Sequence, residues 1–206
     1  MKQQTVEEIL DAFLVEVVSK LGFQRVEALI YSKTVNEGQG YLYFPFRIDP
    51  RGPRYFSCNV GLRFESLERL LRGLSEKSRP TVMTPLHLLR PNQSVFEYKF
   101  ITLDDLKLLN ESLVSDLKEY AMPFIEQYST LAGLRRELEA TTPKNYFVLD
   151  AEGKLVTLAG ILFTHGEKPF AIKILHEALL ARANDLPKKR ILLERALKEM
   201  TPPSTP

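Results

Sequence analysis

Cysteine, histidine and tryptophan are scarce in this sequence of 206 residues, which has one cysteine, three histidines and no tryptophan. Because Cys58 has no second cysteine to pair with, an internal disulfide is excluded, which is typical of proteins kept in a reducing compartment. A lone cysteine inside a predicted strand usually behaves as a small apolar side chain, so we expect Cys58 to be buried. No histidine has a partner at metal-ligand spacing, so no metal site is predicted.

Long apolar runs are also missing. No stretch of roughly 18 apolar residues occurs, so we expect no membrane-spanning helix and no membrane partner. The first residues lead into an amphipathic pattern instead of the uninterrupted apolar core of a secretory signal. Together with the single cysteine, this pattern predicts a cytoplasmic protein.

Motifs of catalysis and of nucleotide binding are absent too. The sequence contains no G-x-S-x-G nucleophile elbow, no P-loop and no G-x-G-x-x-G fingerprint. Gly38 and Gly40 lie between predicted strands, not at the strand-to-helix turn that cradles a phosphate. We therefore predict no catalytic residue and no cofactor, and the favoured interpretation is a non-enzymatic protein.

Neither sign of charge is in large excess, because 28 lysines and arginines face 26 acidic residues for a net charge of +2. Residues 47–90 are more basic, with nine basic against four acidic residues, which gives +5. A nucleic-acid-binding domain usually carries a denser basic stripe, so nucleic acid is not the expected partner. A patch for an anion or an acidic partner and an ordinary solvated surface both remain open for this segment.

Local patterns predict an α+β fold that begins with a helix. Thr5 and Glu8 have the spacing of a capping box, and apolar residues at helical spacing continue to Leu21, just before Gly22. Strand-like runs follow at residues 24–33, 40–48, 54–62 and 95–101. Short turns between consecutive strands favour antiparallel pairing, because parallel pairs need long crossovers.

Helical patterns dominate the rest of the chain. They occur at residues 64–73, 102–117, 130–139, 155–164, 169–183 and from 187 onward. Prolines predict an edge or a bulge at Pro45, an irregular segment over 75–94, a helix break or restart at Pro123 and a breaker at 141–143. Residues 145–149 read as a short extended piece and 150–153 as a turn.

The predicted fold class is therefore α+β, with about four mainly antiparallel strands and an N-terminal covering helix, followed by an α-helical C-terminal region. We assign residues 1–101 to the sheet region and residues 102–206 to a helical region packed on it, as one structural unit. Within the latter, 155–183 resembles one helix pair of a tetratricopeptide-type repeat, with small residues at Ala171 and Ala178. No second copy follows, and a lone pair does not form a solenoid.

Three short segments carry a resemblance to a known group. Leu-Gly-Phe at 21–23 leads into a strand that ends at Tyr31, Phe-Ser-Cys-Asn-Val-Gly occupies 56–61, and Tyr-Ala-Met-Pro-Phe occupies 120–124. In this order they resemble an uncharacterised bacterial domain family of the immunity or accessory-protein type, over residues 5–140. The resemblance implies a bacterial protein of that type but no particular activity.

Arginines beside aromatic residues mark the predicted binding surface. Aromatic side chains gather in residues 41–56. Core and cross-strand packing is the favoured explanation for them, and a binding surface is the alternative, because aromatic residues beside arginines are typical of interface hot spots. The candidate partner-binding residues are Arg47, Arg51, Arg54, Tyr55, His87 and Arg90. We predict binding of a protein partner. The alternatives are a hydrolase or transferase that uses His87 and the arginines of 47–54, and a helical adaptor through 155–200.

Overall fold

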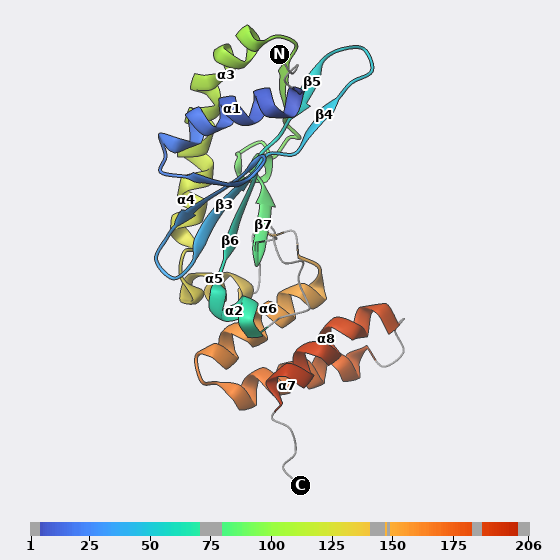
Figure 1. Cartoon of the computed structure of the whole chain (residues 1–206). Helices are drawn as coiled ribbons and strands as arrows, with labels where there is room; N and C mark the ends of the chain where they lie inside the picture. The colour runs from blue at the N-terminus through green and yellow to red at the C-terminus, as the bar shows by residue number, and fades with distance from the viewer. Residues whose placement is uncertain (1–4, 71–79, 141–146, 148, 183–186, 202–206) are drawn as a thin grey trace.

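The computed structural model describes residues 5–70, 80–140, 147, 149–182 and 187–201 (Figure 1). In these ranges the chain is an α+β protein, as predicted, with eight strands in two antiparallel sheets. Figure 1 shows helices on one side of the larger sheet, a hairpin that projects from the top, and a group of helices at the C-terminal end.

The larger sheet has five strands in the order β1-β2-β3-β6-β7. The strands are β1 (Gln24–Glu27), β2 (Ile30–Thr34), β3 (Gln39–Tyr43), β6 (Asn59–Arg63) and β7 (Val82–Pro85). Tyr31, Leu42, Val60 and Thr84 lie in one row across four of these strands, and all four are fully buried. This row is the sheet's contribution to the main core, because alternate residues of a strand face the same side.

The smaller sheet has three strands in the order β4-β5-β8. They are β4 (Phe46–Ile48), β5 (Arg54–Phe56) and β8 (Tyr98–Phe100), and every pairing is antiparallel. The prediction of about four strands is therefore wrong, and the antiparallel pairing is confirmed.

The strand count was too low because each of the first three predicted runs is divided. Residues 24–33 turn back at Ala28 and Leu29 to form the β1–β2 hairpin. The run at 40–48 is divided at Pro45, where the chain leaves the larger sheet for the smaller one. The run at 54–62 is divided at Cys58, which is buried as expected. A proline has no N–H to donate to a ladder, which explains the exit at residue 45.

One predicted irregular segment contains regular structure. Val82–Pro85 is strand β7, and Leu86–Leu89 forms the 3₁₀ helix η1. Residues 71–79 lie outside the described part of the chain, so the predictions for the end of helix 64–73 and the start of segment 75–94 fall there. The predicted breaker at 141–143 and most of the extended piece at 145–149 also lie outside it.

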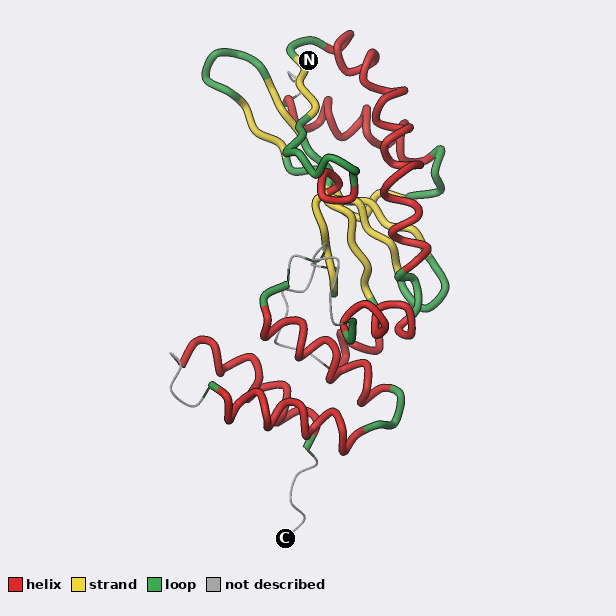
Figure 2. Tube along the Cα trace, turned by 180° about the vertical axis from the view of Figure 1, so that it is seen from behind, coloured by secondary structure: helices red, strands yellow, loops and turns green. Residues whose placement is uncertain are grey.

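Helices α1 (Val6–Ser19), α3 (Leu103–Asp116) and α4 (Met122–Gln127) lie on one side of the sheets (Figures 1 and 2). The capping box of α1 is present as predicted, and Thr102 caps α3 in the same way with Asp105. A π-helical turn, η2 (Leu117–Ala121), joins α3 to α4, so the helix is not interrupted at Pro123. The π-turn directly precedes this proline, whose missing N–H it accommodates.

Two shorter helices complete the body, α2 (Glu65–Leu70) and α5 (Leu131–Leu138). The turn between β2 and β3 is tied to the start of α5, because Glu37 accepts the Leu131 N–H at 2.7 Å and Asn36 donates to the Ser129 hydroxyl at 2.7 Å. Side chains of α1, both sheets, α3, α4 and α5 share one apolar core, which thus joins residues from either side of position 101.

The last three helices, α6 (Ala151–Thr164), α7 (Lys168–Ala181) and α8 (Pro187–Met200), pack around a second apolar cluster (Figure 2). Four alanines of this cluster are buried: Ala159, Ala171, Ala178 and Ala196. The predicted turn at 150–153 is instead the start of α6, because the Asp150 carboxylate accepts the Gly153 N–H at 2.7 Å and caps the helix. The adaptor function of these helices stays a prediction.

Candidate binding surface

The outward face of the smaller sheet carries a row of basic and aromatic side chains. Arg47, Tyr55 and Lys99 stand side by side on β4, β5 and β8. The Arg47 guanidinium carbon lies 4.2 Å from the centre of the Tyr55 ring, a cation–π distance. Arg47 and Lys99 are exposed, whereas Tyr55 is half-buried between them. We call Arg47, Tyr55 and Lys99 the outward row.

Glu97 fixes the position of Arg47. Nε and Nη2 of Arg47 donate to the two carboxylate oxygens of Glu97 at 3.1 and 2.7 Å, a two-point ion pair. This pairing lowers the pKa of Glu97 below its ordinary value and raises the pKa of Arg47. A guanidinium held in this way loses less conformational freedom when a partner binds it.

The inward face of the same sheet belongs to the core. Phe56 and Tyr98 are buried and stacked, with ring centres 4.9 Å apart, and Phe100 lies against Phe56 at 6.1 Å. Phe44 is also fully buried. The two interpretations of the aromatic residues in 41–56 therefore apply to different residues, since Phe44 and Phe56 form core while Tyr55 faces outward.

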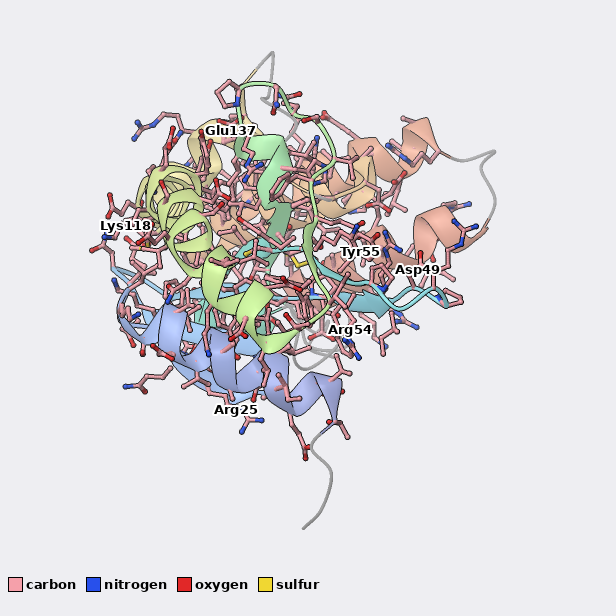
Figure 3. The ribbon with its side chains drawn as sticks, turned by 90° about the horizontal axis from the view of Figure 1, so that it is seen from above. Arg25, Asp49, Arg54, Tyr55, Lys118 and Glu137 are labelled. Carbon is pink, nitrogen blue, oxygen red and sulfur yellow. The ribbon has the colours of Figure 1, made fainter. Side chains whose placement is uncertain are left out.

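The hairpin tip lies well away from the helices (Figure 1). Asp49 shapes the turn, because its carboxylate accepts the Arg51 N–H at 2.8 Å and its own N–H donates to the Pro53 carbonyl at 2.8 Å. Gly52 has a φ of +106°, which only glycine adopts without strain. Arg51 is exposed at this tip. Figure 3 shows Asp49 at the far end of the hairpin and Tyr55 and Arg54 nearer its base.

Arg54 points the other way from the outward row, because it pairs with Ile48 and Phe100 on the inward face. Its Nη1 donates to the Ile101 carbonyl at 2.6 Å, and it lines a small cavity of about 90 Å³. Ile48, its cross-strand neighbour, is 56% exposed.

Arg90 occupies a different site, an open pocket of about 490 Å³ beside α3 and η2. It forms an ion pair with Asp116, which also accepts a hydrogen bond from the Tyr98 hydroxyl. The guanidinium carbon lies 3.9 Å from the centre of the Phe96 ring. Burial and the bond to Asp116 raise the pKa of Tyr98. Because Asp116 neutralises Arg90, this pocket offers no net positive charge.

The predicted residues thus fall into three groups. Four of them, Arg47, Arg51, Arg54 and Tyr55, lie on one hairpin. Arg90 lines its own pocket. His87 lies half-buried in η1 and does not line that pocket or the Arg54 cavity. It also does not line a further cavity of about 320 Å³ at the β2–β3 turn.

Two residues of this surface, Lys99 and Glu97, were missed by sequence reasoning. The alternation of residues 95–101 places Glu97 and Lys99 on the face opposite Tyr98, and this signal was available. The register that sets Lys99 beside Tyr55 was not, because it joins strands more than 40 residues apart.

Among the described residues, no cluster of three or more His, Cys, Asp or Glu side chains is arranged to hold a metal ion. In the same ranges, no helix is both long and apolar enough to cross a membrane. No family model matches the chain, and the searches of curated proteins and of solved structures found no match either.

Proposed function

We propose that the chain is a cytoplasmic protein-binding module that docks an acidic surface of a partner protein on the outward row of the smaller sheet. The observation that carries the proposal is the stacking of Arg47 on Tyr55, with Lys99 next to Tyr55 on the neighbouring strand, on a hairpin whose tip projects from the body. The resemblance to bacterial immunity and accessory proteins agrees with a binding role.

The chemistry of the outward row fits an acidic protein partner. Tyrosine and arginine are enriched at binding hot spots, because a ring supplies a large contact area at low entropic cost and a guanidinium forms directed hydrogen bonds. Glu97 neutralises only part of the charge, since Lys99 and Arg51 have no ion pair within the described part of the chain. A partner carboxylate that reaches Lys99 or Arg51 therefore gains electrostatic attraction without competing against Glu97.

The test is affinity capture of the tagged protein from a lysate of its source cells, followed by mass spectrometry. The test variant carries Arg51→Glu and Lys99→Glu, which reverses the two free charges and leaves the Arg47–Glu97 pair intact. The matched control carries Lys118→Glu on η2 and Lys198→Glu on α8, the same change of net charge at two exposed positions. Lys118 and the hairpin tip lie at opposite sides of the molecule in Figure 3.

We expect the wild type and the control to capture the same stoichiometric protein, and the test variant to lose most of it. The expected loss is about tenfold or more, because like charges brought together across an interface cost several kcal/mol. Capture should also weaken with added salt, since these charges lie at a solvated surface. Equal capture by the test variant, or equal loss by the control, would contradict the proposal. Circular dichroism of all three proteins checks that the fold is retained.

A further inference from the structure

The small cavity at the base of the β4–β5 hairpin lies between the first turns of α1 and α3. Val6 and Ile9 line it from α1, and Leu103 and Leu106 line it from α3, together with Phe100 of β8. Its volume is about 90 Å³. Pockets for drug-sized ligands span roughly 300–1,000 Å³, so this one suits a single aliphatic side chain.

Arg54 is the one charged residue among those that line this cavity. Its Nη1 donates to the Ile101 carbonyl at 2.6 Å, which fixes the head group at the cavity. Its Nε is buried and has no acceptor within the described ranges of the chain. Because a buried donor on a cation is costly to leave unpaired, this position favours an acceptor that carries negative charge.

The acidic residues at the two helix starts do not fill this role. Asp105 accepts the N–H groups of Ile101 and Thr102, both at 2.8 Å, and Glu8 accepts the Thr5 N–H at 2.7 Å. Neither carboxylate lines the cavity. Both are committed to capping, and Glu7 and Asp104, the other acidic residues of these first turns, do not line the cavity either, so neither helix start supplies negative charge to it.

The rim of the cavity is apolar and open to solvent. Ile101 and Leu103, which line it, are 54% and 57% exposed, and Ile48, the cross-strand neighbour of Arg54, is 56% exposed. Exposed apolar residues grouped around a concave site are typical of interaction surfaces. A ligand for this site therefore combines an apolar group with a carboxylate.

We propose that the cavity binds the C-terminal residue of a partner polypeptide, with its aliphatic side chain between α1 and α3 and its carboxylate on Arg54. This inference rests on the proposed function, because the cavity lies on the same hairpin and the inference names the partner's anchor. A C-terminal leucine, isoleucine or valine carries an apolar side chain and a carboxylate on a single Cα. An internal glutamate or aspartate lacks that apolar group, so the C-terminal residue matches both features in the smallest space.

The experiment is fluorescence anisotropy with a labelled hexapeptide that ends in leucine, measured as the free acid and as the C-terminal amide. We expect saturable binding of the acid and about tenfold weaker binding of the amide, since the amide loses the charge-assisted hydrogen bonds. Arg54→Met keeps an unbranched side chain and should weaken binding of the acid by about tenfold while leaving the amide unchanged. Lys118→Met, which removes a positive charge at an exposed position on η2 outside both proposed binding sites, should bind as the wild type does.

A second variant covers the case in which Arg54→Met does not fold. Leu103→Glu changes an exposed rim residue, so the fold should tolerate it, and it places a negative charge where the peptide carboxylate enters. We expect it to weaken binding of the free acid more than binding of the amide, because both ligands lose an apolar contact and only the acid meets a like charge. Circular dichroism and a thermal scan of each variant establish that the comparison is between folded proteins.

Several results would overturn this inference. They are equal affinity for acid and amide, unchanged binding in the folded variants, or no saturable binding of peptides ending in leucine, isoleucine or valine at millimolar concentration. If free 4-methylpentanoate binds as tightly as the peptide, the ligand is a small carboxylic acid and the peptide assignment fails. Because the peptide assay needs no cellular partner, its outcome is independent of the capture experiment with Arg51→Glu and Lys99→Glu.

Discussion

The carboxylate of Asp11 is predicted to be a main source of stability at the β1–β2 hairpin. Asp11 lies on α1 and is only 7% exposed. Its Oδ1 accepts the Leu29 N–H at 2.9 Å and the Tyr31 hydroxyl at 2.6 Å, and its Oδ2 pairs with Arg25 at 2.8 Å. Leu29 has a φ of +61°, which is unfavourable for leucine, so this bond holds a strained turn in place.

Replacing Asp11 with alanine should lower the free energy of unfolding by about 3 kcal/mol. The Leu29 N–H loses its acceptor inside the protein, and a buried unpaired donor costs about 1–3 kcal/mol. The Tyr31 hydroxyl loses less, because it also donates to the Asp11 main-chain carbonyl at 3.1 Å, which the substitution keeps. Arg25 is 53% exposed, so its ion pair should contribute only about 0.5 kcal/mol.

The assay is urea unfolding followed by far-UV circular dichroism and tyrosine fluorescence. Arg25→Ala is the matched control, since it removes the exposed partner of the same carboxylate. Tyr31→Phe should cost about 1 kcal/mol, between the two. A loss below about 1 kcal/mol for Asp11→Ala, or an equal loss for Arg25→Ala, would refute this account of the turn.

Three further predictions follow from buried groups elsewhere. Burial raises the pKa of the Cys58 thiol above its ordinary value of 9.0. The thiol therefore loses its proton at a lower pH in the unfolded chain than in the folded one, and the free energy of unfolding should fall as the pH rises above 9.0. Urea titrations at several pH values should show a smaller fall for Cys58→Ala. Asp116→Ala leaves Arg90 and the Tyr98 hydroxyl unpaired and should lower the free energy of unfolding by about 3 kcal/mol, measured in the same way, whereas a loss near zero would show that water replaces the carboxylate. Gly40→Ala places a Cβ 2.9 Å from Cγ2 of Ile125 and should cost about 1–3 kcal/mol, and most of this cost should disappear in an Ile125→Ala background, which lacks Cγ2, if the contact is the cause.

Helix starts could be predicted from the sequence because their causes are local. Thr5 and Glu8 contact each other across three residues, and Thr102 and Asp105 do the same, so spacing alone identifies both caps. The end of α1 is equally local, because Gly22 has a φ of +82°.

The β1–β2 turn could not be predicted because its cause is distant. Ala28 and Leu29 carry none of the glycine or asparagine signals of a tight hairpin, and the positive φ of Leu29 is held by Asp11, 18 residues earlier. Sequence reasoning therefore combined β1 and β2 into a single strand.

The candidate site was predictable only in part. Composition identifies the arginines and Tyr55 of the hairpin as candidates, but it does not say which side chain faces which way. Strand register decides that Tyr55 joins Arg47 on the outward face while Arg54 lies on the inward face beside the cavity. His87 and Arg90 were grouped with them because they lie in one basic segment, and the fold places Arg90 beside Asp116 instead.

The most direct test of the central claim is photo-crosslinking in the source cells with p-benzoylphenylalanine in place of Tyr55. Phe170 on α7, which is 50% exposed, provides the matched control position. Binding through the outward row predicts one dominant crosslinked protein from position 55 and none from position 170, with the crosslink mapping to an acidic segment of that protein. A dominant crosslink from position 170 and none from position 55 would contradict the claim and assign binding to the C-terminal helices.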